Sequence, residues 1–284
     1  MKLCRFGAAG AEKPGLIDAE GCLRNLSGHC RDIDPTVFRP QGLTQLAKID
    51  PVSLPVVTEI PRFGVPFTGM SKFICIGLNY SDHAAEAGLA VPPEPIIFLK
   101  ANSALCGPND DTIKPLGSTR LDWEVELGVV IGSRANNVAE TDALSHVAGY
   151  CVVNDVSERA FQMQSSQWDK GKGCDTFGPV GPWLVTADDV GDPQNLELWL
   201  DVNGRRRQAG NTRTMIFGVK TLVSYVSRYM TLLPGDIIAT GTPPGVGMGI
   251  KPEPVWLNVG DEVKLGIGGL GAQTQKIVAH STFC

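Results

Sequence analysis

The stretch LDWEVELGVVIG, residues 121–132, decides how the rest of the chain is interpreted. Side chains alternate between the two faces of a strand, so Glu124 and Glu126 point one way and their apolar neighbours point the other way. One interpretation is an amphipathic edge strand with its acidic face in water. The run GVVIG that follows is apolar on both faces, however, and favours a strand inside a sheet. Carboxylates buried there, with Asp122 just before them, need a compensating partner.

The composition is that of a folded protein with a sizeable core. The chain has 284 residues, 43% of them hydrophobic, and a net charge of -5 that disfavours binding to a nucleic-acid backbone. It shows neither a signal-peptide run nor the roughly 18 consecutive apolar residues of a membrane span. The 8 cysteines are scattered without metal-binding spacing, which is typical of reduced thiols. We therefore expect a cytoplasmic protein that binds neither nucleic acid nor membranes.

Two regions of different character follow one another along the chain. Residues 1–67 contain short strands and turns and end in the proline-rich run VSLPVVTEIPRFGVPF, which predicts a small β-rich domain and a linker. Residues 68–284 contain apolar β-type runs separated by glycine and proline, with one clear helical pattern in residues 214–230. The strands do not alternate with helices as in a doubly wound sheet, so we predict an α+β, β-rich fold.

Two glycine-rich runs match nucleotide-binding motifs only in part. GIGGLG at 266–271 fits the dinucleotide-binding pattern. The segment that follows it, AQTQKIVAHSTFC, is short and has the composition of a strand, so it predicts a hairpin instead of a βαβ unit. GTPPGVGMG at 241–249 lacks the lysine and hydroxyl residue of a P-loop, although the backbone of such a loop can line a pocket. Asn203 and Gly204, between two β-type runs, predict a type I′ hairpin.

A third carboxylate lies at the end of another predicted strand. Asp155 follows the apolar run 147–153 and precedes a segment that looks helical. Together with Glu158 it also fits a capping box, and the two roles are compatible. If the two strands are neighbours, Asp155 converges with Glu124 and Glu126, and the three charges repel one another unless a cation separates them. With four histidines and no H-E-x-x-H motif, oxygen ligands are favoured, and hence Mg²⁺, Mn²⁺ or Ca²⁺.

Candidate catalytic groups lie in two further segments. In GLNYSDHAAEAG, residues 77–88, His83 and Glu86 are three apart and share one face of a helical turn. A carboxylate beside an imidazole orients it and raises its basicity, which suits a general base for water. Flanking glycines would let this segment act as a lid, and an exposed helical turn is the alternative. Lys170 and Lys172 stand among glycines, where a lysine can stabilise an enolate or simply occupy a surface turn.

The order and the amino-acid sequences of eight segments resemble those of the fumarylacetoacetate hydrolase family. The segments are FICIGLNYSDHAAE, PIIFLK, LDWEVELGVVIG, GYCVVNDVSER, KGCDTFGPVGPW, VNGRRRQ, PGDIIATGTPPGVG and GDEVKLGIGGLG. They extend from about Ser71 to Gly271. The resemblance implies the family's mixed β-sandwich roll, with a small N-terminal domain, a catalytic domain over residues 68–284, and assembly as a homodimer.

The resemblance also assigns roles to residues that match the family's motifs. The metal ligands that it implies are Glu124, Glu126 and Asp155. The catalytic groups that it implies are His83, Glu86 and Lys172, with Lys172 in preference to Lys170. The residues implied to bind the substrate beside the metal are Arg159, Gln162, Asp175 and Thr242. Because every catalytic position is intact, an active enzyme is implied, and a binding protein that keeps the fold without turnover is the alternative.

The reaction implied by the resemblance is a Mg²⁺-dependent hydrolysis of a carbon–carbon bond in a 2,4-dioxo acid of the acylpyruvate type, giving pyruvate and a second acid. His83 would activate water, and Lys172 would stabilise the enolate. Related members decarboxylate oxaloacetate or isomerise unsaturated dioxo acids, and the shared motifs do not separate these reactions. The N-terminal sequence RFGAAGAEKPGLIDAEGCLRNLS most resembles that of members that hydrolyse 2,4-diketo-3-deoxy-L-fuconate or L-rhamnonate in sugar-acid breakdown.

Overall fold

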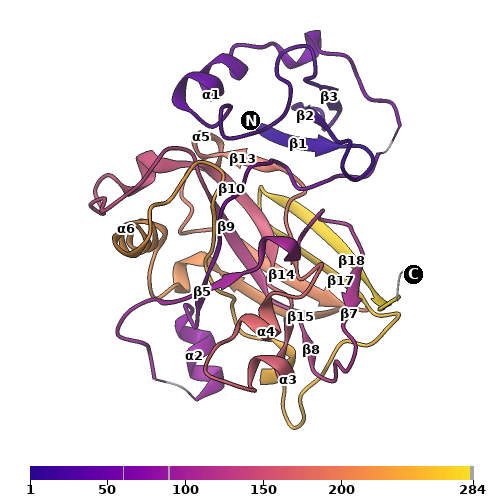
Figure 1. The fold of residues 1–284 in the computed structure, drawn as a ribbon, viewed down its shortest axis with the longest axis vertical. Coiled ribbons are helices and arrows are strands. Elements are labelled where there is room, and N and C mark those ends of the chain that lie inside the picture. The colour runs from indigo at the N-terminus through magenta and orange to yellow at the C-terminus, as the bar shows by residue number, and fades with distance from the viewer. Residues whose placement is uncertain (60, 89, 282–284) are drawn as a thin grey trace.

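The computed structural model describes residues 1–59, 61–88 and 90–281. Within these residues the main sheet has nine strands, with β10 and β9 at its middle (Figure 1). The strands follow in the spatial order β3 (Leu23–Asn25), β2 (Lys13–Ile17), β1 (Lys2–Phe6), β13 (Leu184–Thr186), β10 (Val147–Asn154), β9 (Val125–Ile131), β16 (Ile237–Ala239), β4 (Phe73–Gly77) and β5 (Ile96–Lys100). Every residue of β9 and β10 is buried. The acidic stretch therefore belongs to an interior strand, and the edge-strand interpretation is wrong.

A second, smaller sheet packs against one face of the main sheet. Its strands are, in order, β15 (Arg205–Asn211), β14 (Glu197–Val202), β17 (Glu262–Ile267), β18 (Gly271–Ala279) and β7 (Thr112–Lys114). Leu200 of β14 and Leu265 of β17 share a hydrophobic core with Val129 of β9. Two short strand pairs are also formed, namely β6 (Leu105–Cys106) with β12 (Gly178–Pro179) and β8 (Leu121–Asp122) with β11 (Ser157–Glu158). The predicted β-rich, mixed sandwich is confirmed.

Both predicted hairpins are present. Strands β14 and β15 pair antiparallel around Asn203 and Gly204, whose φ angles of 52° and 74° are those of a type I′ turn. The run 266–271 forms the turn between β17 and β18, where Gly269 has a φ of 79° that favours glycine. The glycine-rich run near the end of the chain is thus a hairpin, as predicted, and not the start of a phosphate-binding helix.

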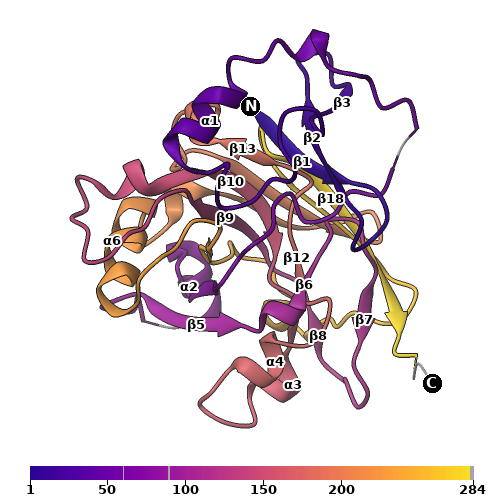
Figure 2. The ribbon, with the colours of Figure 1, turned by 45° about the horizontal axis from the view of Figure 1, so that its top comes forward.

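The N-terminal residues extend the main sheet. Strand β1 pairs antiparallel with β13, although the two are far apart in the sequence. Leu3 and Phe38 share a hydrophobic core with Val153 of β10. Figures 1 and 2 show this indigo region, with α1 (Pro40–Leu46), covering one end of the molecule. The division into domains at residue 67 stays a prediction, and the shared sheet fixes how the two parts are joined.

Figure 1 shows three short helices in the part of the molecule opposite the N-terminal region. They are α2 (Ser81–Ala87), α3 (Arg159–Gln162) and α4 (Asp169–Lys172). Two further described helices are α5 (Ala187–Val190) and α6 (Val219–Tyr229). The helix predicted over 214–230 is confirmed as α6 but begins later, because Ile216 and Phe217 donate backbone hydrogen bonds to Asn79. None of the described helices has the length and apolar character needed to cross a membrane.

Candidate active site

Three carboxylates meet where β9 begins and β10 ends. The strands pair antiparallel with Glu126 opposite Val153, and the backbone N–H of Asp155 donates to the carbonyl of Glu124 at 2.9 Å. This register brings one carboxylate oxygen from each of Glu124, Glu126 and Asp155 within 4.8 Å of the others. All three residues are buried. The convergence that the sequence predicts for neighbouring strands is therefore confirmed.

Buried cations from three different elements surround this carboxylate cluster. Lys172 of α4 donates to one oxygen of Glu124 and one oxygen of Asp155, both at 2.7 Å. Arg159 of α3 pairs with the other oxygen of Glu124 at 2.5 Å. Lys100, at the end of β5, pairs with the other oxygen of Asp155. Because all of these groups are buried, the ion pairs are shielded from water and hold the carboxylates in place.

The carboxylates differ in how their charges are compensated. Burial alone would raise the pKa of Glu124, but Arg159 and Lys172 lower it well below the usual range. Glu126 accepts a hydrogen bond from the N–H of Gly241 at 2.9 Å and forms no ion pair with any described residue. Burial and the charges of the other two carboxylates raise the pKa of Glu126 well above its ordinary value. Glu126 is therefore the carboxylate that most needs a further cation.

The cluster fits a divalent cation. Its donors are carboxylate oxygens, which Mg²⁺, Mn²⁺ and Ca²⁺ prefer. Oxygens bound at about 2.0–2.6 Å to one ion lie no more than about 5 Å apart, and the oxygens of the cluster meet this limit at 4.8 Å. A cation among them would also relieve the repulsion that raises the pKa of Glu126. A divalent metal site is thus consistent with both the geometry and the charge of the cluster.

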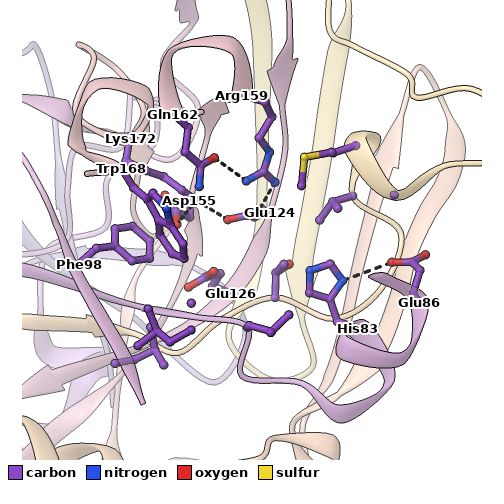
Figure 3. A pocket seen from close by; sticks show the side chains of 18 of the residues that line it. His83, Glu86, Phe98, Glu124, Glu126, Asp155, Arg159, Gln162, Trp168 and Lys172 are labelled. Atoms are coloured by element: carbon purple, nitrogen blue, oxygen red, sulfur yellow. Dashed lines mark hydrogen bonds and ion pairs between the residues drawn. The ribbon is translucent and has the colours of Figure 1, made fainter. Parts of the chain in front are cut away.

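His83 and Glu86 lie one turn apart on α2. Nδ1 of His83 is 3.3 Å from Oε2 of Glu86, and the same oxygen accepts the backbone N–H of Gly245 at 3.2 Å. The helix ends at Gly88, whose φ of 66° is left-handed. Figure 3 shows the other edge of the imidazole turned toward the carboxylate cluster. Glu86 therefore orients one ring nitrogen and leaves the other facing the pocket.

A cavity of about 460 Å³ joins the carboxylate cluster to this pair of side chains. Every predicted site residue except Asp175 lines it. Thr242 and Gly249 are among the lining residues, so the run 241–249 borders the pocket, as the sequence allows. Trp168 meets Phe98 edge-on, with ring centroids 5.2 Å apart. Figure 3 shows these two rings on the opposite side of the carboxylates from the imidazole, so the cavity has a polar wall and an aromatic wall.

Two expectations from the sequence differ from the structure. Asp175 is exposed, lies in a turn after α4 and does not line the pocket. Its role in binding substrate stays a prediction that the geometry does not support. The capping-box interpretation is wrong, because Glu158 caps α3 by accepting the N–H of Ala160 at 3.0 Å. Asp155 is engaged by two lysines instead.

Several side chains at the site are not identified by the sequence. Lys100 is a lone charge at the end of the apolar run 96–100, and that isolation is the signal that could have revealed it. Phe98 and Trp168 carry no such signal, because their contact joins an edge strand to a loop distant in the sequence. Asp122, which the sequence groups with the two glutamates, pairs with Arg159 at 2.8 Å and is not a member of the cluster.

These observations define a class of protein: a β-rich sandwich with a buried site of three carboxylates beside a histidine–glutamate pair. Residues 72–278 match the family described as "Fumarylacetoacetate (FAA) hydrolase C-terminal". A curated relative from Burkholderia ambifaria is 60% identical over 276 residues, which are 97% of this chain and 98% of that protein. Its name gives hydrolase as a provisional class without a substrate.

Solved structures agree with this family match. A fumarylacetoacetate hydrolase from Exiguobacterium antarcticum is 36% identical with a TM-score of 0.89, covering 99% of this chain and 100% of that one. A maleylpyruvate hydrolase from Sphingobium sp. SYK-6, in complex with manganese(II) and pyruvate, is 29% identical with a TM-score of 0.83 and the same coverage. Other similar chains carry isomerase titles. The chain belongs to the fumarylacetoacetate hydrolase family, whose solved members include hydrolases and isomerases.

Proposed function

We propose that this protein is a divalent-cation-dependent hydrolase that cleaves the bond between C3 and C4 of a 2,4-dioxo acid to give pyruvate and a second acid. The proposed cation is Mg²⁺, with Mn²⁺ or Ca²⁺ as alternatives. The observation that carries the proposal is that three carboxylates, a histidine–glutamate pair and a buried lysine meet in one cavity. The manganese ion and pyruvate of the maleylpyruvate hydrolase structure support it.

Glu124, Glu126 and Asp155 would hold the cation. When bound, the cation supplies positive charge that polarises the substrate's oxygens and offsets the negative charge that develops during cleavage. Around it, the substrate-binding residues that we propose are Arg159, Gln162 and Thr242. The amide oxygen of Gln162 accepts from Arg159 at 3.0 Å, which fixes both side chains on the polar wall of the cavity.

His83 is the group that activates water in this proposal. Glu86 accepts the hydrogen of Nδ1, so the second ring nitrogen is the one that removes a proton from the attacking water. The water oxygen bonds to C4, the C3–C4 bond breaks, and its electron pair stays on the three-carbon fragment as the enolate of pyruvate. A proton added to C3 completes pyruvate, and the C4 fragment leaves as a carboxylic acid.

Lys172 stabilises the negative charge of the enolate in the same scheme. Its ammonium group is buried between Glu124 and Asp155 and lies 5.0 Å from the ring centroid of Phe98. Burial lowers the pKa of Lys172, but the charges of Asp155 and Glu124 raise it above its ordinary value, so the group stays cationic. A fixed charge in a cavity that excludes water stabilises developing charge more strongly than a charge in water does.

The acyl part of the substrate is the least constrained element of the proposal. We propose a 2,4-diketo-3-deoxy sugar acid of the L-fuconate or L-rhamnonate type as the first candidate, because the N-terminal sequence resembles that of hydrolases of such acids. The alternative reactions at the same site are decarboxylation of oxaloacetate and isomerisation of an unsaturated dioxo acid, since both also pass through a stabilised enolate. Assembly as a homodimer stays a prediction.

One assay tests the function. Loss of enol absorbance is followed for a panel of acylpyruvates, sugar-derived 2,4-dioxo acids and oxaloacetate, first with Mg²⁺ or Mn²⁺ and then with a chelator. The expected result is cation-dependent cleavage that yields one pyruvate per substrate consumed. If no 2,4-dioxo acid is cleaved, the hydrolase proposal fails. Carbon dioxide release from oxaloacetate, or isomerisation without cleavage, would then identify the replacement reaction.

A further inference from the structure

Asp122 is a fully buried carboxylate that the proposed reaction does not use. It ends β8, two residues before Glu124, but is not part of the carboxylate cluster. Its Oδ2 accepts the Nε hydrogen of Arg159 at 2.8 Å. Arg159 in turn pairs with Glu124 at 2.5 Å. One side of Asp122 is thus linked to the cluster through a single arginine.

The other side of Asp122 holds the loop of residues 243–250. Oδ1 accepts the N–H of Gly247 at 2.6 Å, and Oδ2 accepts the N–H of Met248 at 3.1 Å. A Cβ atom on Gly247 would lie 2.7 Å from Oδ1, so the absence of a side chain there is what permits the approach. Met248 lines the cavity. Asp122 therefore anchors a loop that forms part of the pocket wall.

The loop continues to the histidine–glutamate pair. The N–H of Gly245 donates to Glu86 at 3.2 Å, and the carbonyl of Gly245 accepts from the indole N–H of Trp123 at 3.1 Å. Glu86 then contacts His83. Ion pairs and hydrogen bonds therefore lead from the cluster to Asp122 and Gly247, the backbone of the loop connects Gly247 to Gly245, and Gly245 is hydrogen-bonded to Glu86 beside the imidazole. Hydrogen bonds to a buried charged group are the strong ones in such a series.

We propose that Asp122 is a positioning residue that fixes loop 243–250, and through Gly245 the His83–Glu86 pair, relative to the carboxylate cluster. The inference rests on the proposed function for its kinetic readout only. Its physical basis is that α2 is a short helix near the surface, whereas the cluster belongs to the core, so a rigid link is needed between them. A general base that is displaced by about 1 Å can lose about a hundredfold in rate.

The substitution Asp122→Asn tests this inference with little change in volume. Asp122 accepts four hydrogen bonds, from Arg159, Gly247, Met248 and the backbone of Trp123. An asparagine side chain has one acceptor oxygen and an amide nitrogen that is a donor only, so at least part of this set loses its acceptor. The metal ligands themselves are untouched. The variant therefore loosens the link without replacing a metal ligand, His83 or Glu86.

Three quantities are measured on the full chain with Mn²⁺: hydrogen exchange of peptides covering 243–250, Mn²⁺ affinity, and kcat on a substrate that the wild type cleaves. We expect Asp122→Asn to speed exchange in this loop and lower kcat by about tenfold each, with Mn²⁺ affinity changed by less than about threefold. Asp18→Asn is the matched control, because Asp18 also binds an arginine Nε and a backbone N–H but lies far from the pocket. It should change none of the three.

The outcomes separate this inference from the proposed function. If the wild type cleaves no dioxo acid, the proposed function fails, and loop exchange alone still decides whether Asp122 anchors the loop. Unchanged exchange, or faster exchange with unchanged kcat, overturns the positioning role. An equal loss of Mn²⁺ affinity and kcat overturns it too, because Asp122 would then act through the cluster. If Asp122→Asn does not fold, hydrogen exchange of the wild type decides: the N–H groups of Gly247 and Met248, which donate to Asp122, should exchange slowly, and fast exchange of both overturns the positioning role.

Discussion

The carboxylate cluster and the His83–Glu86 pair border the same cavity but are built in opposite ways. Glu126 lies on the interior strand β9 and is 2% exposed, and Asp155 directly follows β10 and is 0% exposed. The register of β9 against β10 holds Glu126, and buried ion pairs hold Asp155. The side chains of His83 and Glu86 are 14% and 29% exposed and lie on α2, a helix of seven residues. Few contacts tie this helix to the rest of the site, and the hydrogen bond from Gly245 is one of them.

Because of this difference, the cluster can bind the cation independently of the histidine that activates water. The position of the cluster is set by the sheet itself, so any folded molecule has its cation site formed. The position of the imidazole depends on a surface helix and one loop, so it can change without disturbing the core. Cation binding and water activation should therefore be separable by mutation, and the following predictions test this separation from the largest expected effect to the smallest.

Removal of a cluster carboxylate should abolish cation binding and hydrolysis together. Glu126→Ala takes away one ligand of the proposed cation, and we expect Mn²⁺ affinity to fall by more than about a hundredfold and hydrolysis to fall below detection. Calorimetric titration with Mn²⁺ and the enol assay measure the two effects. Normal Mn²⁺ binding by this variant would show that Glu126 is not a ligand of the cation.

Removal of the imidazole should abolish hydrolysis while leaving cation binding intact. His83→Ala leaves the cluster intact, so Mn²⁺ affinity should be unchanged, while kcat falls by about 10²–10⁴ because the general base is lost. His146→Ala is the control, because His146 is hydrogen-bonded to Ser133 and does not line the cavity. Full turnover by His83→Ala would show that another group activates the water.

Removal of a cation behind the cluster should act on stability. Lys100→Met leaves Asp155 with Lys172 as its remaining ion-pair partner, and we expect the free energy of unfolding to fall by about 3 kcal/mol. Lys72→Met is the matched control, because Lys72 also pairs with a buried aspartate but is partly exposed to water, and its loss should cost less. Urea unfolding measures both. Equal losses would mean that the cluster is no more tightly held than the surface.

The uncompensated charge of Glu126 should make the metal-free protein less stable as pH rises. Its folded pKa is raised by burial, Asp155 and Glu124, whereas in the unfolded chain it returns to about 4.3. The resulting stabilisation is complete below the unfolded pKa and is lost as pH rises through the folded pKa, at up to about 1.4 kcal/mol per pH unit. Urea unfolding with chelator at several pH values should show this slope in the wild type and a smaller slope in Glu126→Gln.

The parts of the site that lie on one element could be predicted from the sequence. The alternation in residues 121–132 predicted the shared face of Glu124 and Glu126, because a strand has a fixed period of two. The three-residue spacing of His83 and Glu86 predicted their contact, because a helical turn has a fixed pitch. In both cases local geometry alone determines which side chains meet.

The parts that depend on how distant elements meet could not be predicted in this way. Lys100 reaches Asp155 only because the end of β5 lies close to the end of β10, and the order of strands in the sheet is not encoded in any local pattern. The pairing of β1 with β13 is another such long-range contact. Asp175 shows a different limit: the family resemblance places it at the site, whereas the structure places it in an exposed turn outside the pocket, and its role in substrate binding stays a prediction.

The proposed metal site is tested most directly by a crystal structure grown with Mn²⁺ and pyruvate, with the ion located by its anomalous scattering. We expect one strong peak bound by oxygens of Glu124, Glu126 and Asp155, with pyruvate beside it and the ring of His83 facing the remaining space. A peak elsewhere, or no peak at a Mn²⁺ concentration that supports turnover, would contradict the central claim that the core strands hold the cation and the surface helix supplies the base.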